Sequence, residues 1–195
     1  MRKKYPCADA TRSALLDAAL QLSREQEYDA VTVRQICRRA GVSNGAFYHH
    51  YASKDQLVLY AFLDFDRFIT PDLVRQCEAL SPMEALYFVF REYLEYIQQV
   101  VGRAMPSYYR VLLKGESNEY RDHNRPFLKA LRRHCARCQQ AGLLTGDYTS
   151  EELMELFWRF LWGLLFDWCL CGCEGLLWPK AQRDLRYWMR GLAPA

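Results

Sequence analysis

The sequence lacks a hydrophobic run long enough to cross a membrane. Its most apolar stretch, residues 156–170, contains Arg159 and Asp167, and it is shorter than the roughly 20 apolar residues that a spanning helix needs. No apolar segment follows the basic residues near the start of the chain, so no secretory signal is expected. These absences predict a cytoplasmic protein whose eight cysteines remain reduced thiols.

The motifs of the common enzyme classes are also missing. There is no glycine-rich phosphate-binding loop, no nucleophile motif and no pair of carboxylates at a meaningful spacing. Only four histidines are present: His49, His50, His123 and His134. The sequence therefore predicts a protein that is not an enzyme, and no cofactor is expected.

The composition is that of a folded protein with an uneven distribution of charge. Hydrophobic residues make up 51% and charged residues 25% of the 195 positions, which suits one or two domains with a buried core and argues against disorder. The formal net charge is only +3, but the first 54 residues hold nine basic and five acidic side chains. Positive charge gathered at one end of the chain is typical of a nucleic-acid-binding domain.

The most informative stretch is residues 32–51, TVRQICRRAGVSNGAFYHHY. Thr32 and Gln35 form a capping box that predicts the start of a short helix. Gly41 suits the left-handed backbone that ends a helix. Ser43 then supplies the capping hydroxyl of a second helix. The stretch therefore predicts two short helices joined by a tight turn.

The second of these helices has the side chains of a helix that enters the major groove of DNA. Phe47 is expected to point back into the core. The outer face keeps four residues that can approach phosphates or base edges: Asn44, Gly45, Tyr48 and His49. Ser53 and Gln56 form the next capping box, and Lys54 stands in the first turn of the helix that follows, where a helix N-terminus already favours a phosphate.

Residues 13–57 resemble the TetR family of bacterial transcriptional regulators, in which a Tyr-His-x-aromatic run lies between such a turn and a Ser-Lys-acidic helix start. The resemblance implies an all-α protein with a three-helix helix-turn-helix DNA-binding domain, at residues 1–52, and a helical ligand-binding and dimerisation domain, at residues 53–195. It also implies a homodimer on a palindromic operator in double-stranded DNA. The DNA contacts that it carries over are Thr32, Arg34, Ser43, Asn44, Gly45, Tyr48, His49 and Lys54.

Two positions depart from the family pattern. Glu27 stands where the family usually has glycine at the end of the first helix, so this helix exit is expected to be built differently. Asn44 stands where a basic residue is common, which leaves the base preference open.

The remainder of the chain predicts a series of helices. Residues 53–68 predict one helix that links the two domains, and residues 82–101 predict another that is rich in aromatic side chains. A capping box at residues 149–152 predicts a helix that continues to residue 170 with apolar side chains on almost every side, so it is either central core or covered by a partner subunit. The resemblance places the family's dimer interface in the last two helices, and we favour a homodimer.

The resemblance also implies a pocket for a small, mostly apolar molecule in the helical domain. Aromatic residues with hydroxyl or indole groups are candidates to line it, because these groups can orient a ligand. The candidates are Tyr87, Tyr93, Tyr108, Tyr109, Trp158 and Trp162. The alternative for each of them is an ordinary place in the core or in an interface.

Five cysteines form two groups with a possible second use. The groups are Cys135 with Cys138, and Cys169 with Cys171 and Cys173. Thiolates at these spacings can bind zinc or a soft metal, or sense oxidation; the alternative is that they are small buried apolar residues, and no metal site is assigned. The sequence thus predicts a TetR-like transcriptional regulator, most simply a repressor released by a small-molecule ligand, with a metal- or redox-sensing regulator as the alternative.

Overall fold

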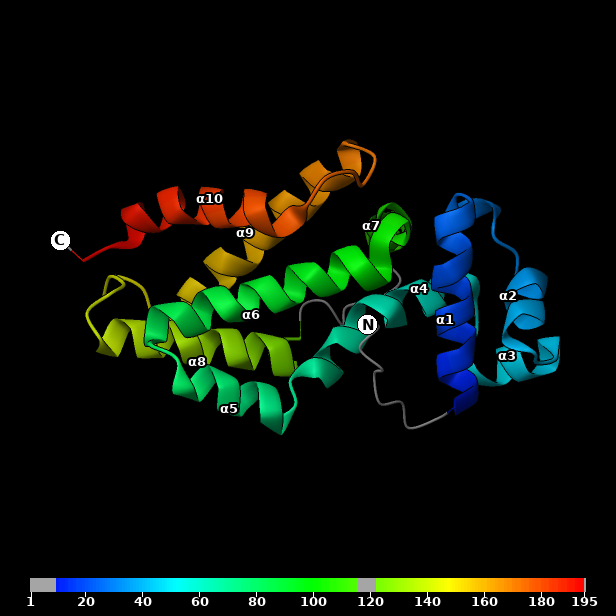
Figure 1. Ribbon diagram of the computed structural model, residues 1–195, viewed down its shortest axis with the longest axis horizontal. Coiled ribbons are helices and arrows are strands. Elements are labelled where there is room, and N and C mark those ends of the chain that lie inside the picture. Colours follow the sequence, from blue (N-terminus) through cyan, green and yellow to red (C-terminus); the bar gives the residue numbers. More distant parts are fainter. Residues whose placement is uncertain (1–9, 116–121, 195) are drawn as a thin grey trace. The chain divides into compact units, whose positions relative to one another are not determined.

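The computed structural model describes residues 10–115 and 122–194, and these residues form helices and loops without a strand (Figure 1). The predicted all-α class is confirmed. Contacts divide the described chain into two compact units: residues 10–64 with 99–115, and residues 65–98 with 122–194. Among the residues described, no helix is both long and apolar enough to pass through a bilayer.

The first unit is built on helix α1 (Ala10–Glu25). The chain continues through four elements: the 3-10 turn η1 (Tyr28–Ala30), α2 (Val33–Ala40), α3 (Asn44–His50) and α4 (Lys54–Leu63). It returns to this unit with two more, the 3-10 turn η4 (Gly102–Ala104) and α7 (Met105–Leu113). Apolar side chains from each of α1 to α4 are fully buried, among them Leu15, Ile36, Phe47 and Leu57.

Short polar side chains determine where α2, α3 and α4 begin. The Thr32 hydroxyl accepts a hydrogen bond from the Gln35 backbone N–H at 3.2 Å, and the Gln35 side chain accepts one from the Thr32 N–H at 2.7 Å. Ser43 and Ser53 accept equivalent bonds at the starts of α3 and α4. Gly41 ends α2 with a φ of +71°. The three predicted helix starts are confirmed.

Helix α7 joins the first unit through polar and aromatic contacts. The Ser107 hydroxyl donates to the Asp29 carboxylate at 3.0 Å, and the Arg110 guanidinium pairs with the same carboxylate. The ring of Tyr108 stacks on that of Phe62 with centroids 3.9 Å apart. Compact packing therefore continues beyond residue 52, while the extent of the DNA-binding domain itself stays a prediction.

The second unit is a bundle of five helices within the described residues: α5 (Pro71–Ala79), α6 (Pro82–Tyr96), α8 (Pro126–Gln140), α9 (Ser150–Leu170) and α10 (Leu177–Trp188). Helix α8 packs against both α6 and α9, and α10 packs against the same two helices. Aromatic rings fill the centre, where Tyr93 stacks on Phe127 with centroids 4.4 Å apart and Trp158 lies edge-on to Tyr93.

Both predicted long helices change form where the chain passes between the units. Residues 53–68 are α4 followed by the 3-10 turn η2 (Asp64–Phe68), and residues 82–101 are α6 followed by the π-helical turn η3 (Ile97–Val101). The prediction of two continuous α-helices is wrong in these last turns. The reason is that apolar periodicity over a single turn does not distinguish α from 3-10 or π spacing.

Helix α9 is buried along one side only. Its buried positions are Leu153, Met154, Phe157, Trp158, Leu161, Leu164, Leu165 and Trp168. The other side is open at Gly163, and it includes Phe166 and Leu170, which are 49% and 73% exposed. These exposed side chains are large and apolar, and they share the open side of the helix with the charged Arg159 and Asp167.

The left-handed backbone at Gly41 leads to a stability prediction. Replacing Gly41 with Ala should lower the free energy of unfolding of the first unit by about 1–2 kcal/mol, because a Cβ is disfavoured at this φ. No atom lies within 4 Å of the added Cβ, so a steric clash would not contribute. Hydrogen exchange at the α2 and α3 amide groups measures the change.

The control is Gly45→Ala, one helix further on. An added Cβ at Gly45 meets only the Ser43 hydroxyl, at 3.7 Å, in ordinary helical backbone. This variant should keep or raise the stability by up to about 1 kcal/mol. Equal losses in both variants would contradict the assignment of the Gly41 effect to its backbone conformation.

Candidate nucleic-acid interface and second-unit cavity

The α2–α3 pair is held in place from its buried side. Ile36 and Phe47 are completely buried and Cys37 is nearly so, and burial raises the pKa of the Cys37 thiol. At the turn, the Val42 N–H donates to the Cys37 carbonyl at 3.0 Å, which closes the end of α2. These apolar contacts fix the angle between the helices and leave their opposite faces for a ligand.

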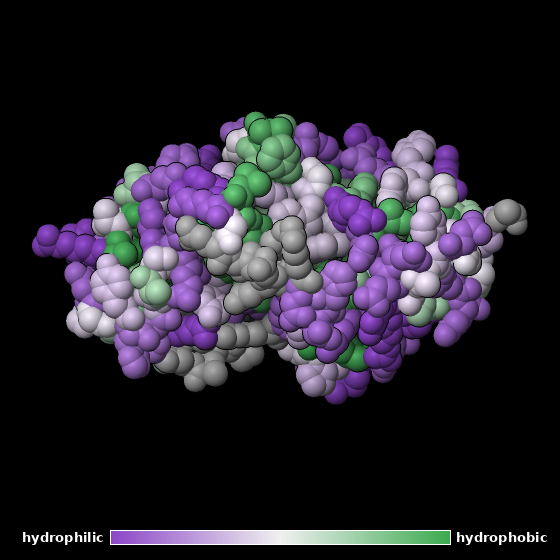
Figure 2. All heavy atoms as spheres, turned by 180° about the vertical axis from the view of Figure 1, so that it is seen from behind, coloured by the Kyte–Doolittle hydropathy of each residue, from purple (hydrophilic) through white to green (hydrophobic). Residues whose placement is uncertain are grey.

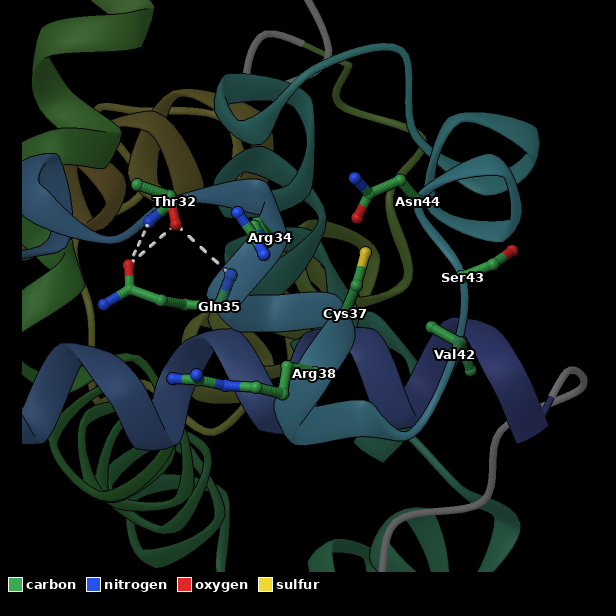
Figure 3. A pocket seen from close by; sticks show the side chains of 8 residues that line it. All are labelled: Thr32, Arg34, Gln35, Cys37, Arg38, Val42, Ser43 and Asn44. Carbon is green, nitrogen blue, oxygen red and sulfur yellow. Dashed lines mark hydrogen bonds between the residues drawn. The ribbon is translucent and has the colours of Figure 1, made fainter.

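Four of the predicted DNA-contacting residues surround one hollow of about 570 Å³ between α2 and the start of α3 (Figure 3). These residues are Thr32, Arg34, Ser43 and Asn44. Figure 3 shows the Asn44 amide pointing from the start of α3 back toward α2. The hollow also includes Arg38, which sequence reasoning missed. The available signal was its position four residues after Arg34, on the same helix face.

The remaining predicted contacts on α3 point outward. Tyr48 is 60% exposed and rests edge-on against Phe47, with ring centroids 5.3 Å apart. His49 is exposed as well, and Gly45 leaves the backbone accessible. The predicted recognition surface is thus an open face with hydrogen-bond donors.

The arginines of α2 differ in what they face. Arg39 forms a two-pronged pair with Glu25, with both N–O distances 2.8 Å, and this hydrogen bonding raises the pKa of Arg39 and lowers that of Glu25. Arg34 and Arg38 are exposed and have no ion-pair partner within the described part of the chain. Their charges therefore remain available to phosphates or base edges.

Lys54 is placed differently from the predicted phosphate contact. Its ammonium donates hydrogen bonds to the backbone carbonyls of Tyr28, Asp29 and Val31, each at 2.9 Å. An ammonium has three N–H donors, so all of them are satisfied within the protein. Burial lowers the pKa of Lys54. This geometry favours a structural role for Lys54, which holds the segment that leads into α2.

The six aromatic candidates for a ligand pocket do not come together. Tyr108 and Tyr109 lie on α7 in the first unit. Tyr93, Trp158 and Trp162 share the aromatic core of the second unit. Tyr87 of α6 packs its ring edge-on against the ring of Trp178 of α10, with centroids 6.3 Å apart.

A separate cavity of about 210 Å³ lies between α5, α6 and α8. We call it the second-unit cavity; its lining is Ile69, Leu73, Val74, Cys77, Glu78, Val89, Pro126, Lys129, Ala130, Arg133 and His134. None of the six aromatic candidates lines it. The predicted pocket residues are all aromatic, whereas most residues that line this cavity are aliphatic.

The cysteine groups do not form a metal site in the described residues, where no three potential ligands of the His, Cys, Asp or Glu types come together. Cys135 and Cys138 are buried, and burial raises the pKa of Cys138 to about 11. A thiol with such a pKa stays protonated near neutral pH, which disfavours metal binding and oxidation.

Comparison with known proteins gives the family. The model of the bacterial regulatory proteins of the tetR family matches residues 15–61. The HTH-type transcriptional repressor KstR2 of Mycolicibacterium smegmatis is 33% identical over 156 residues, which cover 77% of this chain and 73% of that protein. The chain therefore belongs to the TetR family, and the predicted resemblance is confirmed.

Other similar proteins match over shorter lengths. The uncharacterized regulator YwcC of Bacillus subtilis is 46% identical over 52 residues, or 27% of this chain and 23% of YwcC. The Tn10 TetC protein of Escherichia coli is 32% identical over 45% of each chain. The chain thus spans less than half the length of the first curated relatives that it matches.

Solved structures agree in fold. The fatty acid degradation regulator FadR of Bacillus halodurans superimposes with a TM-score of 0.68 at 17% identity, covering 98% of both chains. The FadR of Thermus thermophilus gives a TM-score of 0.64 at 19% identity, covering 90% of this chain and 91% of that chain. At these identities the likeness concerns the fold alone.

The position of Lys54 yields a test that separates structure from DNA contact. Lys54→Met should lower the free energy of unfolding of the first unit by about 1–3 kcal/mol, because three carbonyls lose a charged hydrogen-bond donor. Hydrogen exchange at the α2 amide groups measures this loss.

Tyr48→Phe is the matched variant for an outward group. It should leave stability within about 0.5 kcal/mol of the original value and weaken DNA binding by about three- to tenfold, because a phenolic donor is lost from the exposed face. If Lys54→Met is as stable as the original protein and loses only DNA affinity, the structural role is wrong and Lys54 binds phosphate.

Proposed function

We propose that this protein is a dimeric transcriptional repressor that binds a palindromic DNA operator and releases it when a small ligand binds the second unit. The observation that carries the proposal is the surface of α2 and α3, which exposes Arg34, Arg38, Asn44 and Tyr48. Both helices begin at a capping side chain, and their opposite faces are buried in the first unit. Membership of a family of bacterial regulators supports it. Such a protein acts on DNA in the cytoplasm.

Each residue of this surface has a role in the proposal. Arg34 and Asn44 read base edges, since arginine pairs with guanine and asparagine with adenine in the major groove. Arg38, Tyr48 and His49 bind phosphates.

Three further positions shape the surface. Gly45 lets the backbone come close to DNA. Thr32 and Ser43 act first as helix caps, because their hydroxyls already accept backbone N–H groups. Two copies of α3 then enter successive major grooves, about 34 Å apart.

The open face of α9 supports dimerisation. A hollow of about 450 Å³ between α9 and α10 is bordered by Phe160, Gly163 and Leu164 and by four charged residues: Arg159, Asp167, Lys180 and Asp184. Hydrophobic side chains also gather at the upper edge of Figure 2, where the connection between α9 and α10 lies in Figure 1, and Leu176 of this connection is 67% exposed. Apolar surface of this kind marks an interaction site.

A ligand response has support from similar proteins and from the chain's own junctions. The FadR structures of Thermus thermophilus and Bacillus subtilis were determined with lauroyl-CoA and stearoyl-CoA. In this protein, the chain passes from the second unit to the first within η3, between Gln98 and Gln99. Gln98 Oε1 accepts a hydrogen bond from the Leu177 N–H in the second unit, and the Gln99 carbonyl accepts one from Arg24 in the first. A ligand that breaks the Gln98 hydrogen bond in the second unit therefore acts directly on Gln99, the next residue, whose carbonyl binds Arg24 in the first unit.

DNA binding is tested with fragments that cover the region upstream of the protein's own gene. We expect one palindromic site to bind, with an affinity that falls as salt rises. Arg38→Gln should lower the slope of log K against log salt by about two in a dimer, since each copy loses one phosphate contact. Arg34→Gln should relax the preference at one base pair of each half-site.

Arg132→Gln removes an equal charge from the exposed side of α8 in the second unit and should change neither property. Fluorescence anisotropy at several salt concentrations provides both measurements. The proposed interface is wrong if Arg34→Gln and Arg38→Gln bind like the original protein, or if Arg132→Gln loses as much affinity.

The dimer has its own test at Gly163. Gly163 is exposed, and an added Cβ there has no neighbour within 4 Å inside the subunit, so a side chain can leave the helix at this position without a clash at its base. We expect Gly163→Arg to fold but to sediment at the 23.0 kDa mass of one chain, and the original protein to sediment at twice that mass.

Gly146→Arg is the control, since Gly146 is an exposed loop glycine that also has no neighbour within 4 Å. It should remain dimeric in sedimentation velocity. A dimer that survives Gly163→Arg would place the interface elsewhere.

A further inference from the structure

The second-unit cavity has one aliphatic part. Six side chains from three directions form it: Ile69, Leu73, Val74, Val89, Pro126 and Ala130. Val89 of α6 is almost fully buried, and Leu73 and Val74 of α5 are half-buried. The aliphatic part therefore suits a flexible apolar chain better than a polar molecule.

Basic groups from α8 form the polar part. Lys129 and Arg133 line the cavity one helical turn apart, and Glu78 of α5 pairs with Arg133. Lys129 Nζ has no hydrogen-bond or ion-pair partner in the residues described. The lining thus includes two cationic side chains and one carboxylate, so it keeps an excess positive charge beside its aliphatic part.

His134 adds a neutral hydrogen-bond donor. It is 4% exposed, and burial, with the nearby Arg137 guanidinium, lowers its pKa to about 4, so the imidazole is neutral near pH 7. Its Nδ1 lies 3.4 Å from Arg137 Nη1, which can only donate. Nδ1 is therefore the acceptor and the proton is on Nε2, which has no partner among the described residues.

The donor that orients His134 is itself fixed. Arg137 donates to the carbonyls of Cys77 and Leu80 at 3.0 Å each, and so caps the end of α5. These bonds hold α5 and α8 together at one end of the cavity, and they set the imidazole before any ligand arrives. A preformed donor of this kind adds affinity because binding does not have to order it.

We propose that the second-unit cavity binds a small aliphatic carboxylate, with its chain against the aliphatic residues and its carboxylate near Lys129 and His134. A cavity of about 210 Å³ has room for about seven water molecules, since each occupies about 30 Å³ in the liquid. This volume suits a medium-length chain such as octanoate. The inference rests on the proposed function, since it names the ligand class of a ligand-responsive repressor.

Calorimetry of the whole protein with octanoate and octan-1-ol tests the ligand class. Octanoate should bind with a Kd below about 1 mM, and octan-1-ol, which has the same chain but no charge, at least about tenfold more weakly. Lys129→Met should weaken octanoate by about tenfold and leave octan-1-ol unchanged. Arg132→Met, which removes a neighbouring charge outside the cavity, should change neither.

Ala130→Phe tests the location. Ala130 lines the cavity from a helical position, where a phenylalanine should fill the space and abolish binding of both compounds. Circular dichroism and melting temperature check that each variant folds. The proposal is overturned if octanoate fails to bind at several millimolar, if octan-1-ol binds equally well, or if binding survives Ala130→Phe.

A parallel measurement with operator DNA separates this proposal from the proposed function. If octanoate binds the cavity but leaves operator affinity unchanged, the site stands and ligand-induced release is wrong. If the protein binds an operator and does not bind octanoate, the DNA-binding function stands and the carboxylate site is wrong.

Discussion

The first unit depends on the three hydrogen bonds that the Lys54 ammonium donates to backbone carbonyls. The acceptors are the carbonyls of Tyr28, Asp29 and Val31, and the Tyr28 hydroxyl in turn donates to the Lys54 carbonyl at 2.9 Å. These carbonyls lie where η1 passes into α2, and only that of Tyr28 also accepts a backbone N–H there, from Val31 at 3.1 Å, among the bonds of the described residues. Burial of Tyr28 raises its pKa, so its hydroxyl stays a donor at physiological pH. The result is a rigid entry into α2, which carries Arg34 and Arg38.

The same segment connects the recognition helices to α7. Asp29 offers its backbone carbonyl to Lys54 and its carboxylate to Ser107 and Arg110. A shift of α7 along its axis therefore acts on Asp29, which Lys54 also holds and which lies three residues before Thr32, the cap of α2. Because α7 follows the π-helical turn η3, a change in the second unit has a short covalent route to this contact. The proposed ligand response therefore does not require one long helix that moves as a rigid rod between the units, and α4 already ends at Leu63.

Local rules predicted the local features, and tertiary contacts decided the rest. The caps at Thr32, Ser43 and Ser53 and the turn at Gly41 follow from side chains within four residues of each other, so the helix-turn-helix was readable from sequence. The hydrogen bonds of the Lys54 ammonium could not be predicted from local sequence, because their acceptors lie 23 to 26 residues away; its contact with DNA stays a prediction. The tyrosines and tryptophans predicted to line a ligand pocket stay a prediction, and rings such as Tyr93 and Trp158 pack on one another. Aliphatic residues like Leu73 and Val89 carry no sequence mark that separates a cavity wall from a packed core.

Arginine is the clearest example of one residue type with several roles that counting does not resolve. Arg39 is neutralised by Glu25, and Arg125, only 5% exposed, pairs with Asp66 at 2.7 Å inside the second unit. Arg137 caps the end of α5, whereas Arg34 and Arg38 keep their charges open. An excess of positive charge in the first 54 residues is therefore a weak argument by itself, since part of it is spent on structure. What distinguishes a DNA-binding arginine is an exposed guanidinium on a helix whose opposite face is buried, because only that geometry presents the charge at a fixed angle to a groove.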